Sequence, residues 1–194
     1  MEELLPLLRE RRSVQAYDDE HELSDEQLAT MLEAARWAPS AGNSQPWAFL
    51  VGRRGDAAHR AFVPLLAPSV RRWAPAASAL VFALHRTASG PEPDALVYSD
   101  YAAYDLGQAV AHLTVQASAL GLSCHQFAAF DHDGLAAACA VPPHWRVTVG
   151  VAVGRGVVSD LAPRSRRPIE EVAFGARFSE PLATQTAARP PGRG

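Results

Sequence analysis

The chain has 194 residues, of which 48% are hydrophobic and 20% charged, a balance typical of one soluble globular domain. Its net charge of −3 argues against a nucleic-acid-binding surface, and no apolar run is long enough to span a membrane. All 18 basic residues are arginine, which excludes a Walker A lysine and a lysine Schiff base. A bound phosphate would therefore need arginine, hydroxyl groups or backbone amides.

The N-terminal residues and the cysteines indicate the compartment. The first residues are acidic and lack the basic and then apolar order of a signal peptide, so we expect a cytoplasmic protein with no membrane partner. Cys124 and Cys139 stand in apolar surroundings without Cys-x-x-Cys spacing. We expect reduced, buried thiols, and neither a disulfide framework nor a metal site.

The first third of the chain predicts helices around one strand. A short amphipathic helix is expected at 4–8. Ser24 and Gln27 have the spacing of a capping box, and the helix that they begin continues to about residue 37. A strand is expected at 47–51, with Arg53 on a surface turn after it, and a helix at 57–66.

The rest of the chain predicts the centre of the fold. The almost wholly apolar segment 76–84 is typical of a strand covered on both faces. The longest helix is expected at 100–120, with Gly121 at its C′ position. Strands are expected at 123–128 and 146–153, and a further helix begins near Asp131.

Helices that alternate with a few buried strands predict one α+β domain. No glycine-rich fingerprint follows an early strand, and Gly154-x-Gly156 lacks a third glycine, so the evidence for a dinucleotide-binding fold is weak. We expect a single domain over residues 1–180 and a disordered tail over 181–194, where proline, glycine and arginine predominate.

The loop between the helix that ends near residue 37 and the strand at 47–51 is rich in side chains that can form hydrogen bonds. It reads Ala38-Pro39-Ser40-Ala41-Gly42-Asn43-Ser44-Gln45-Pro46-Trp47. Each residue before a proline is disfavoured in α geometry, so the helix must stop here. The carboxamides of Asn43 and Gln45 can donate and accept hydrogen bonds, which suits a heterocycle with alternating N–H and C=O groups, although an ordinary helix-to-strand loop has a similar composition.

Together with three other motifs, this loop resembles the FMN-dependent nitroreductase family, from about residue 5 to about 178. The first motif is Arg11-Arg12-Ser13-Val14-Gln15-Ala16-Tyr17. The third begins Asp105-Leu106-Gly107-Gln108-Ala109, continues through Leu113 and Gln116-Ala117, and ends with the run from Ala119 to Asp131. The fourth is Pro163-Arg164-Ser165-Arg166-Arg167-Pro168-Ile169-Glu170-Glu171. The resemblance implies a nitroreductase-like fold, a central mixed β-sheet flanked by helices, with the flavin at the interface of a homodimer.

The resemblance also implies a set of flavin-binding residues. Arg11, Arg12 and Ser13 would hold the FMN phosphate with Arg164 and Arg166, although each arginine cluster taken alone is equally compatible with solvated surface charge. Gln15 replaces a third basic residue of the family, and Ser69 is the nearest polar substitute for a missing asparagine. Pro39, Ser40, Asn43 and Gln45 would reach the flavin of the other subunit. The flavin ring would lie along His125, Gln126, Phe127, Ala128 and Ala129.

The implied activity is electron transfer from NADH or NADPH through FMN to a small-molecule acceptor, a nitroaromatic compound, a quinone or a similar molecule. The flavin itself would carry the chemistry, so no catalytic side chain is expected. His125 is either a packed histidine or a residue in contact with substrate. Two alternatives remain: a flavin-dependent dehydrogenase of another substrate, and an FMN-binding protein without enzymatic activity.

Overall fold

The computed structural model describes residues 3–92, 94–157 and 164–182. Its contacts divide the chain into two compact units, 1–158 and 159–194. All the long helices and the strands lie in the first unit, and the second contributes a short 3₁₀ turn, Ile169–Glu171. Most of the predicted tail, residues 183–194, lies outside the described residues. No helix in the described part is both long and apolar enough to cross a membrane.

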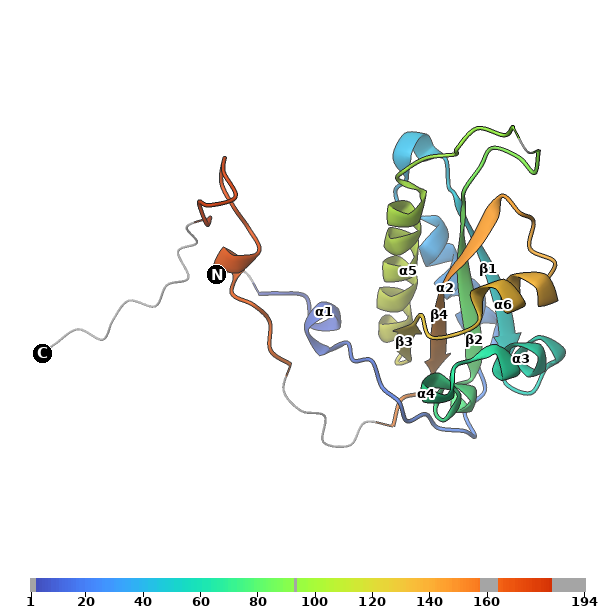
Figure 1. Ribbon diagram of the computed structural model, residues 1–194. Coiled ribbons are helices and arrows are strands. Elements are labelled where there is room, and N and C mark those ends of the chain that lie inside the picture. Colours follow the sequence, from blue (N-terminus) through green and yellow to red (C-terminus); the bar gives the residue numbers. More distant parts are fainter. Residues whose placement is uncertain (1–2, 93, 158–163, 183–194) are drawn as a thin grey trace, which may run out of the picture. The chain divides into compact units, whose positions relative to one another are not determined.

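The first unit is built on a four-stranded sheet in the order β1-β2-β4-β3 (Figure 1). The strands are β1 (Trp47–Arg53), β2 (Ala79–Arg86), β3 (Ser123–Phe127) and β4 (Trp145–Gly154). All three pairings are antiparallel, so the α+β fold is confirmed while the sheet formed by the described residues is not mixed as expected. The physical reason is the position of β4. The strands β2 and β3 run in the same direction, but β4 lies between them, so they do not pair with each other.

Helices cover both faces of the sheet. On one face, α2 (Asp25–Arg36) and α5 (Ala102–Ala119) pack against side chains of alternating strand residues, and this core includes Met31, Leu106, Leu113, Val81 and Val151. On the other face lie α3 (Ala57–Phe62), α4 (Pro68–Arg71) and α6 (His132–Ala138), whose core includes Phe62, Val70, Leu135, Phe82 and Val147. The short helix α1 (Pro6–Glu10) precedes these layers. As predicted, β2 is buried on both faces.

Local signals placed most helix ends correctly. Ser24 Oγ accepts from the Gln27 N–H, and the Ser24 N–H donates to Gln27 Oε1, both at 3.1 Å, so the predicted capping box is confirmed. Gly121 has φ +73°, as a C′ residue requires. The helix expected at 57–66 is shorter, because Pro64 converts its last turn into the 3₁₀ segment Val63–Leu65.

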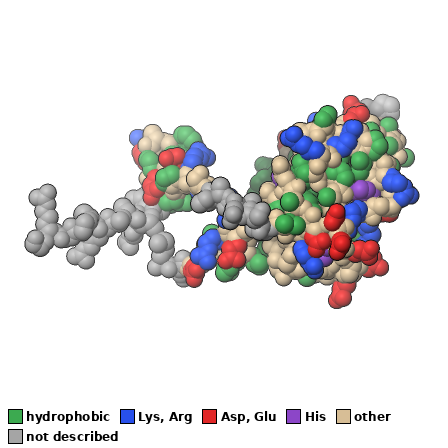
Figure 2. All heavy atoms as spheres, turned by 90° about the horizontal axis from the view of Figure 1, so that it is seen from below, with side chains coloured by type: hydrophobic (Ala, Val, Ile, Leu, Met, Phe, Trp, Pro, Cys, Tyr) green, Lys and Arg blue, Asp and Glu red, His purple; other side chains and the backbone are tan. Residues whose placement is uncertain are grey.

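Arg53 is not on a surface turn, contrary to expectation. It is the last residue of β1, and its guanidinium donates to the Leu23 carbonyl and, at 2.6 Å, to Asp25 Oδ1. Arg53 therefore joins the end of β1 to the start of α2. Elsewhere on the surface, arginine and acidic side chains are interspersed over the face of this unit seen from below (Figure 2), in keeping with the small net charge of −3.

Candidate functional site

The opening arginine pair lies where α1 ends. Arg12 Nη1 donates to the carbonyls of Arg9, Glu10 and Arg11 at 3.2, 3.3 and 3.3 Å, so it caps the last turn of the helix. The guanidinium of Arg11 has a different partner: its Nη1 donates to Ser13 Oγ at 3.1 Å. Both arginines are half-buried, while Ser13 and Gln15 are exposed.

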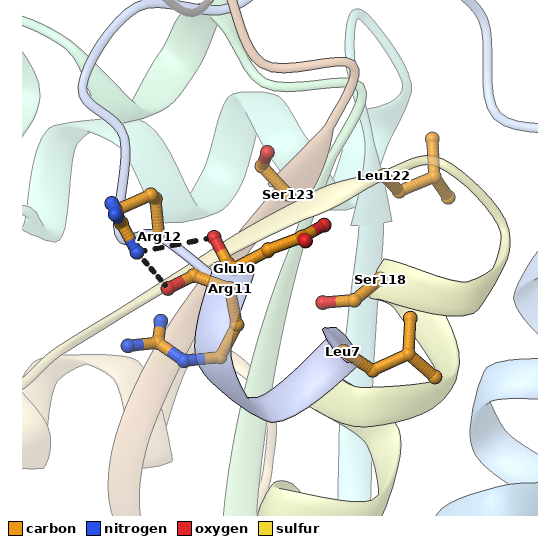
Figure 3. Close-up of a pocket in the computed structure, with 7 residues that line it drawn as sticks. All are labelled: Leu7, Glu10, Arg11, Arg12, Ser118, Leu122 and Ser123. Atoms are coloured by element: carbon orange, nitrogen blue, oxygen red, sulfur yellow. Dashed lines mark hydrogen bonds between the residues drawn. The ribbon is translucent and has the colours of Figure 1, made fainter. Parts of the chain in front are cut away.

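A pocket of about 210 Å³ opens beside these arginines (Figure 3). The two guanidinium groups lie on one side of the view and Leu7, Ser118 and Leu122 on the other. The pocket is lined by Leu7, Glu10, Arg11, Arg12, Ser118, Leu122 and Ser123. It is smaller than the roughly 300–1,000 Å³ of complete ligand pockets, so it suits one polar group of a larger ligand.

His125 connects the arginine segment to β3. Its Nδ1 lies 2.7 Å from the Val14 carbonyl, which can only accept, so Nδ1 carries a proton. The ring stacks on Trp73 with centroids 4.4 Å apart. His125 is therefore packed and hydrogen-bonded. The preceding residue, Cys124, faces the other side of the sheet, and burial raises the pKa of its thiol to about 12, so it is no nucleophile at neutral pH.

The segment after β3 offers backbone donors. Ala128 and Ala129 are exposed, and within the described residues neither of their N–H groups has a hydrogen-bond acceptor. The Ala129 carbonyl accepts from the Ala67 N–H at 3.0 Å, which brings the start of α4, with the exposed Ser69, beside this segment. Gln126 is exposed on β3 and Phe127 is buried. Beyond β3, this edge of the sheet therefore carries two exposed amides that have no acceptor among the described residues.

The carboxamide loop lies at the other end of α5. Its Ala41 N–H donates to Asp105, in the first turn of α5, whereas Ser118 in the last turn lines the arginine pocket. At about 1.5 Å per residue the helix rises about 20 Å between Asp105 and Ser118. Within one chain, the structure therefore does not bring the loop to the arginine pocket.

Residues Pro39, Asn43 and Gln45 are exposed on this loop, and Ser40 is half-buried. The Ser40 hydroxyl accepts from the Gln45 N–H at 3.0 Å, and Gln45 Nε2 donates to the Asn43 carbonyl at 3.2 Å. Gln45 Nε2 also lies 3.4 Å from Asn43 Oδ1, so the two carboxamide side chains lie together on the surface.

The second arginine cluster lies in the second unit. Arg166 is exposed, and its Nη1 donates to the Ser165 carbonyl at 2.9 Å; Arg164 is half-buried. A joint phosphate site of these arginines with Arg11 and Arg12 stays a prediction. Among the described residues, no group of three or more His, Cys, Asp or Glu side chains could hold a metal ion.

The predicted site residues include neither Trp73 nor the polar pocket residues Glu10, Ser118 and Ser123, although Ser123 lies in the third motif. Ser118 and Ser123 line the arginine pocket, and Trp73 supports His125. Serine in a helix or strand gives no sign of which cavity it meets, and a tryptophan 52 positions away gives none of its stacking partner. Asp105, whose carboxylate is buried, begins the third motif. A charged residue among apolar helix positions was the sequence feature that could have marked it as a candidate.

The family assignment follows from the length of the match. The model of the Nitroreductase family covers residues 8–155, which include the arginine segment, the loop and β3. The chain belongs to the nitroreductase family.

Similar proteins from several sources agree with this assignment. A crystal structure described as an oxidoreductase containing FMN has a TM-score of 0.83 at 31% identity, over 92% of this chain and 94% of that chain. An uncharacterized 15.4 kDa protein in the ask 5′ region of Mycolicibacterium smegmatis is 36% identical over 151 residues, 69% of this chain and 99% of that protein.

A nitroreductase family protein of Streptococcus pneumoniae shares the fold, with a TM-score of 0.75 at 20% identity over 89% of this chain and 100% of that chain. A shorter match covers 53 residues, 27% of this chain and 30% of an Archaeoglobus fulgidus protein, at 51% identity. That relative is provisionally named an NADH dehydrogenase/NAD(P)H nitroreductase.

Proposed function

We propose that this nitroreductase family member is an FMN-dependent oxidoreductase that takes electrons from NADH or NADPH and passes them to a nitroaromatic compound, a quinone or a similar small acceptor. One observation carries the proposal: Arg11 bonds to Ser13, and the neighbouring Val14 bonds to His125 on β3. The segment after β3 carries two backbone amides that have no acceptor among the described residues. Support for the cofactor comes from the FMN-containing oxidoreductase that is 31% identical to this chain.

The donors in this region fit FMN. A phosphate dianion needs fixed positive charge and hydroxyl groups, which Arg11, Ser13 and the pocket serines supply next to one another. A flavin ring needs donors at its heteroatoms and a flat supporting surface. The amides of Ala128 and Ala129 are donors of the right kind, and β3 is an edge strand.

When bound, FMN would accept a hydride from the nicotinamide and deliver electrons to the acceptor. The residues of this chain would bind and orient the cofactor. Arg11 and Ser13 would hold the phosphate, the segment from His125 to Ala129 would direct amides at the ring, and Asn43 and Gln45 would contact the ring from a second subunit. The family resemblance assigns Arg164 and Arg166 to the phosphate as well. Arg12 holds the end of α1 in place and adds positive charge.

The distance between the carboxamide loop and the arginine pocket supports the proposal of a homodimer. The loop with Asn43 and Gln45 lies about 20 Å along α5 from the arginine pocket, so a second copy is the natural place for its contacts. Dimerisation, like a cytoplasmic location, belongs to the proposal.

The experiment that tests the function is anaerobic titration of the purified protein. We expect a yellow protein with about one FMN per chain, whose visible absorbance is bleached by NADH or NADPH and restored by a nitroaromatic compound or a quinone. A yellow protein that neither nicotinamide bleaches would favour a dehydrogenase of another substrate or a flavin-binding protein. A colourless protein that FMN does not reconstitute would contradict the proposal.

A further inference from the structure

Two side chains of α5 hold the carboxamide loop, and the proposed flavin contacts make no use of them. Asp105 and Gln108 are one helical turn apart. Asp105 Oδ2 accepts from the Ala41 N–H at 3.0 Å, and Gln108 Nε2 donates to the Pro39 carbonyl at 3.4 Å. The pair therefore holds the loop backbone on both sides of Ser40.

The Asp105 carboxylate is unusual for its burial. It is 2% exposed, and in the described part of the chain no arginine or histidine lies within ion-pair distance of it. The compensating groups are the Ala41 N–H, the Gln108 amide at 3.4 Å and the positive end of α5, where Asp105 lies in the first turn. A buried carboxylate without a cation is costly unless hydrogen bonds compensate it. Packing alone therefore does not account for Asp105.

The loop that this carboxylate holds has a strained backbone. Asn43 has φ +54° and Gln45 has φ +49°, both in the left-handed region that non-glycine residues rarely adopt, and Gly42 between Ala41 and Asn43 has φ +58°. Such residues persist where surrounding contacts determine the backbone, and they concentrate at ligand-binding positions. The contacts here come from Asp105, from Ser40 and from the Tyr98 hydroxyl, which donates to the Ser44 carbonyl at 3.2 Å.

We propose that Asp105 and Gln108 are positioning residues that set the conformation of the carboxamide loop before any ligand arrives. The proposal rests on the proposed function, since that function assigns Asn43 and Gln45 to the flavin. Because the loop is ordered when the protein folds, FMN binding needs no further ordering of Asn43 and Gln45. The affinity for FMN is therefore higher than it would be with a loop that becomes ordered only on binding. Removal of the carboxylate should free the loop and weaken FMN binding without a change in any group that touches FMN.

The test compares three variants with the full-length wild-type protein. D105A removes both acceptors. D105N keeps an oxygen that can accept from the Ala41 N–H but loses the acceptor for Gln108 Nε2, so it separates the bond to Ala41 from the contact with Gln108. V110A is the matched control, because Val110 is buried on the same helix and its side chain has no polar group that could bond to the loop. Hydrogen–deuterium exchange of residues 38–46 in the flavin-free protein and FMN affinity by fluorescence quenching are measured for each.

D105A is expected to speed exchange of residues 38–46 and to weaken FMN binding about tenfold, the lower end of the effect of a hydrogen bond to a charged group. D105N should give exchange and affinity between those of D105A and the wild type, because only the bond to Ala41 is kept. V110A should lower the melting temperature and leave exchange and affinity unchanged. Should D105A fail to fold, Q108A must speed exchange in the same segment.

Unchanged exchange in D105A, or in Q108A where D105A does not fold, overturns the proposal. So does fast exchange with unchanged FMN affinity, since the loop would then serve another purpose. If the wild-type protein itself binds no FMN, the proposed function fails. The exchange comparison then still decides whether Asp105 holds the loop.

Discussion

The two adjacent arginines at the end of α1 have different roles. Arg12 donates to three carbonyls at the helix end, whereas the side-chain contact of Arg11 is with the Ser13 hydroxyl. An anion can bind the guanidinium whose N–H donors are not bonded to the carbonyls at the helix end. At the residue scale, therefore, Arg11 is the primary candidate for the phosphate, and replacement of Arg12 would also disturb α1.

Arg11→Ala is expected to weaken FMN binding roughly tenfold to a hundredfold while the fold stays intact, because each charge-assisted hydrogen bond contributes about 1.5–3 kcal/mol. Arg11→Lys should not restore the affinity fully, since an ammonium group lacks the bidentate fork. Fluorescence quenching of FMN measures both. Arg146→Ala is the control, an exposed arginine in β4 that belongs to no predicted contact; an equal loss there would show that only general positive charge matters.

At the scale of elements, the contact between α3 and β1 depends on a missing side chain. A Cβ on Gly52 would lie 2.6 Å from the backbone nitrogen of His59, so only glycine lets the helix approach the strand this closely. His59 is 7% exposed as a result. This burial lowers the pKa of His59 below its ordinary value, chiefly through desolvation of the charged form, and nearby Asp56 opposes the shift. The packing of one helix thus makes stability depend on pH.

The sign of that dependence follows from proton linkage. In the unfolded chain His59 takes up a proton near pH 6.5, whereas in the folded protein it stays neutral to lower pH. Stability is therefore full above about pH 6.5 and falls as the pH decreases below it, by at most about 1.4 kcal/mol per pH unit for one proton. Urea unfolding at several pH values should show a shallower fall in His59→Gln. The fall should not vanish, because His21 and His85 are shifted in the same direction by burial.

For the whole molecule, the distance between the carboxamide loop and the arginine pocket predicts that each active site is shared between two subunits. If the loop of one chain serves the flavin of the other, each site takes Arg11 from one subunit and Asn43 from its partner. A mixed dimer of an Arg11→Ala chain with an Asn43→Ala chain then has one intact site and one with both defects. In an arrangement within single chains, each site has one defect and none is intact.

The mixed dimer, purified with two different affinity tags, should therefore bind one FMN per dimer with wild-type affinity, while both parent homodimers bind weakly. Weak binding at every site of the mixed dimer would place the loop and the arginines in the same subunit's site. Sedimentation should give twice the chain mass of 20.8 kDa at micromolar concentration. A monomer with full flavin content would rule out shared sites altogether.

Most elements of this protein, and the residue types at its candidate site, follow from local sequence. The capping box at Ser24, the C′ glycine at 121 and the apolar run of β2 depend on neighbours within a few positions. The first two lie where predicted, whereas β2 begins at Ala79, three residues after the predicted start at 76. The opening arginine motif and the carboxamide loop were likewise identifiable, because residue type and spacing determine which hydrogen bonds they can make.

Only the tertiary structure decided which of these segments meet. The insertion of β4 between β2 and β3, the anchoring of Arg53 to Leu23, and the hydrogen bond from His125 to Val14 join residues far apart in the chain. Likewise, the burial of Asp105 and its bond to Ala41 depend on how α5 packs beside the loop. Periodicity and capping report on neighbours along the chain, whereas these contacts depend on the packing of whole elements, whose free energy is a sum over many distant residues.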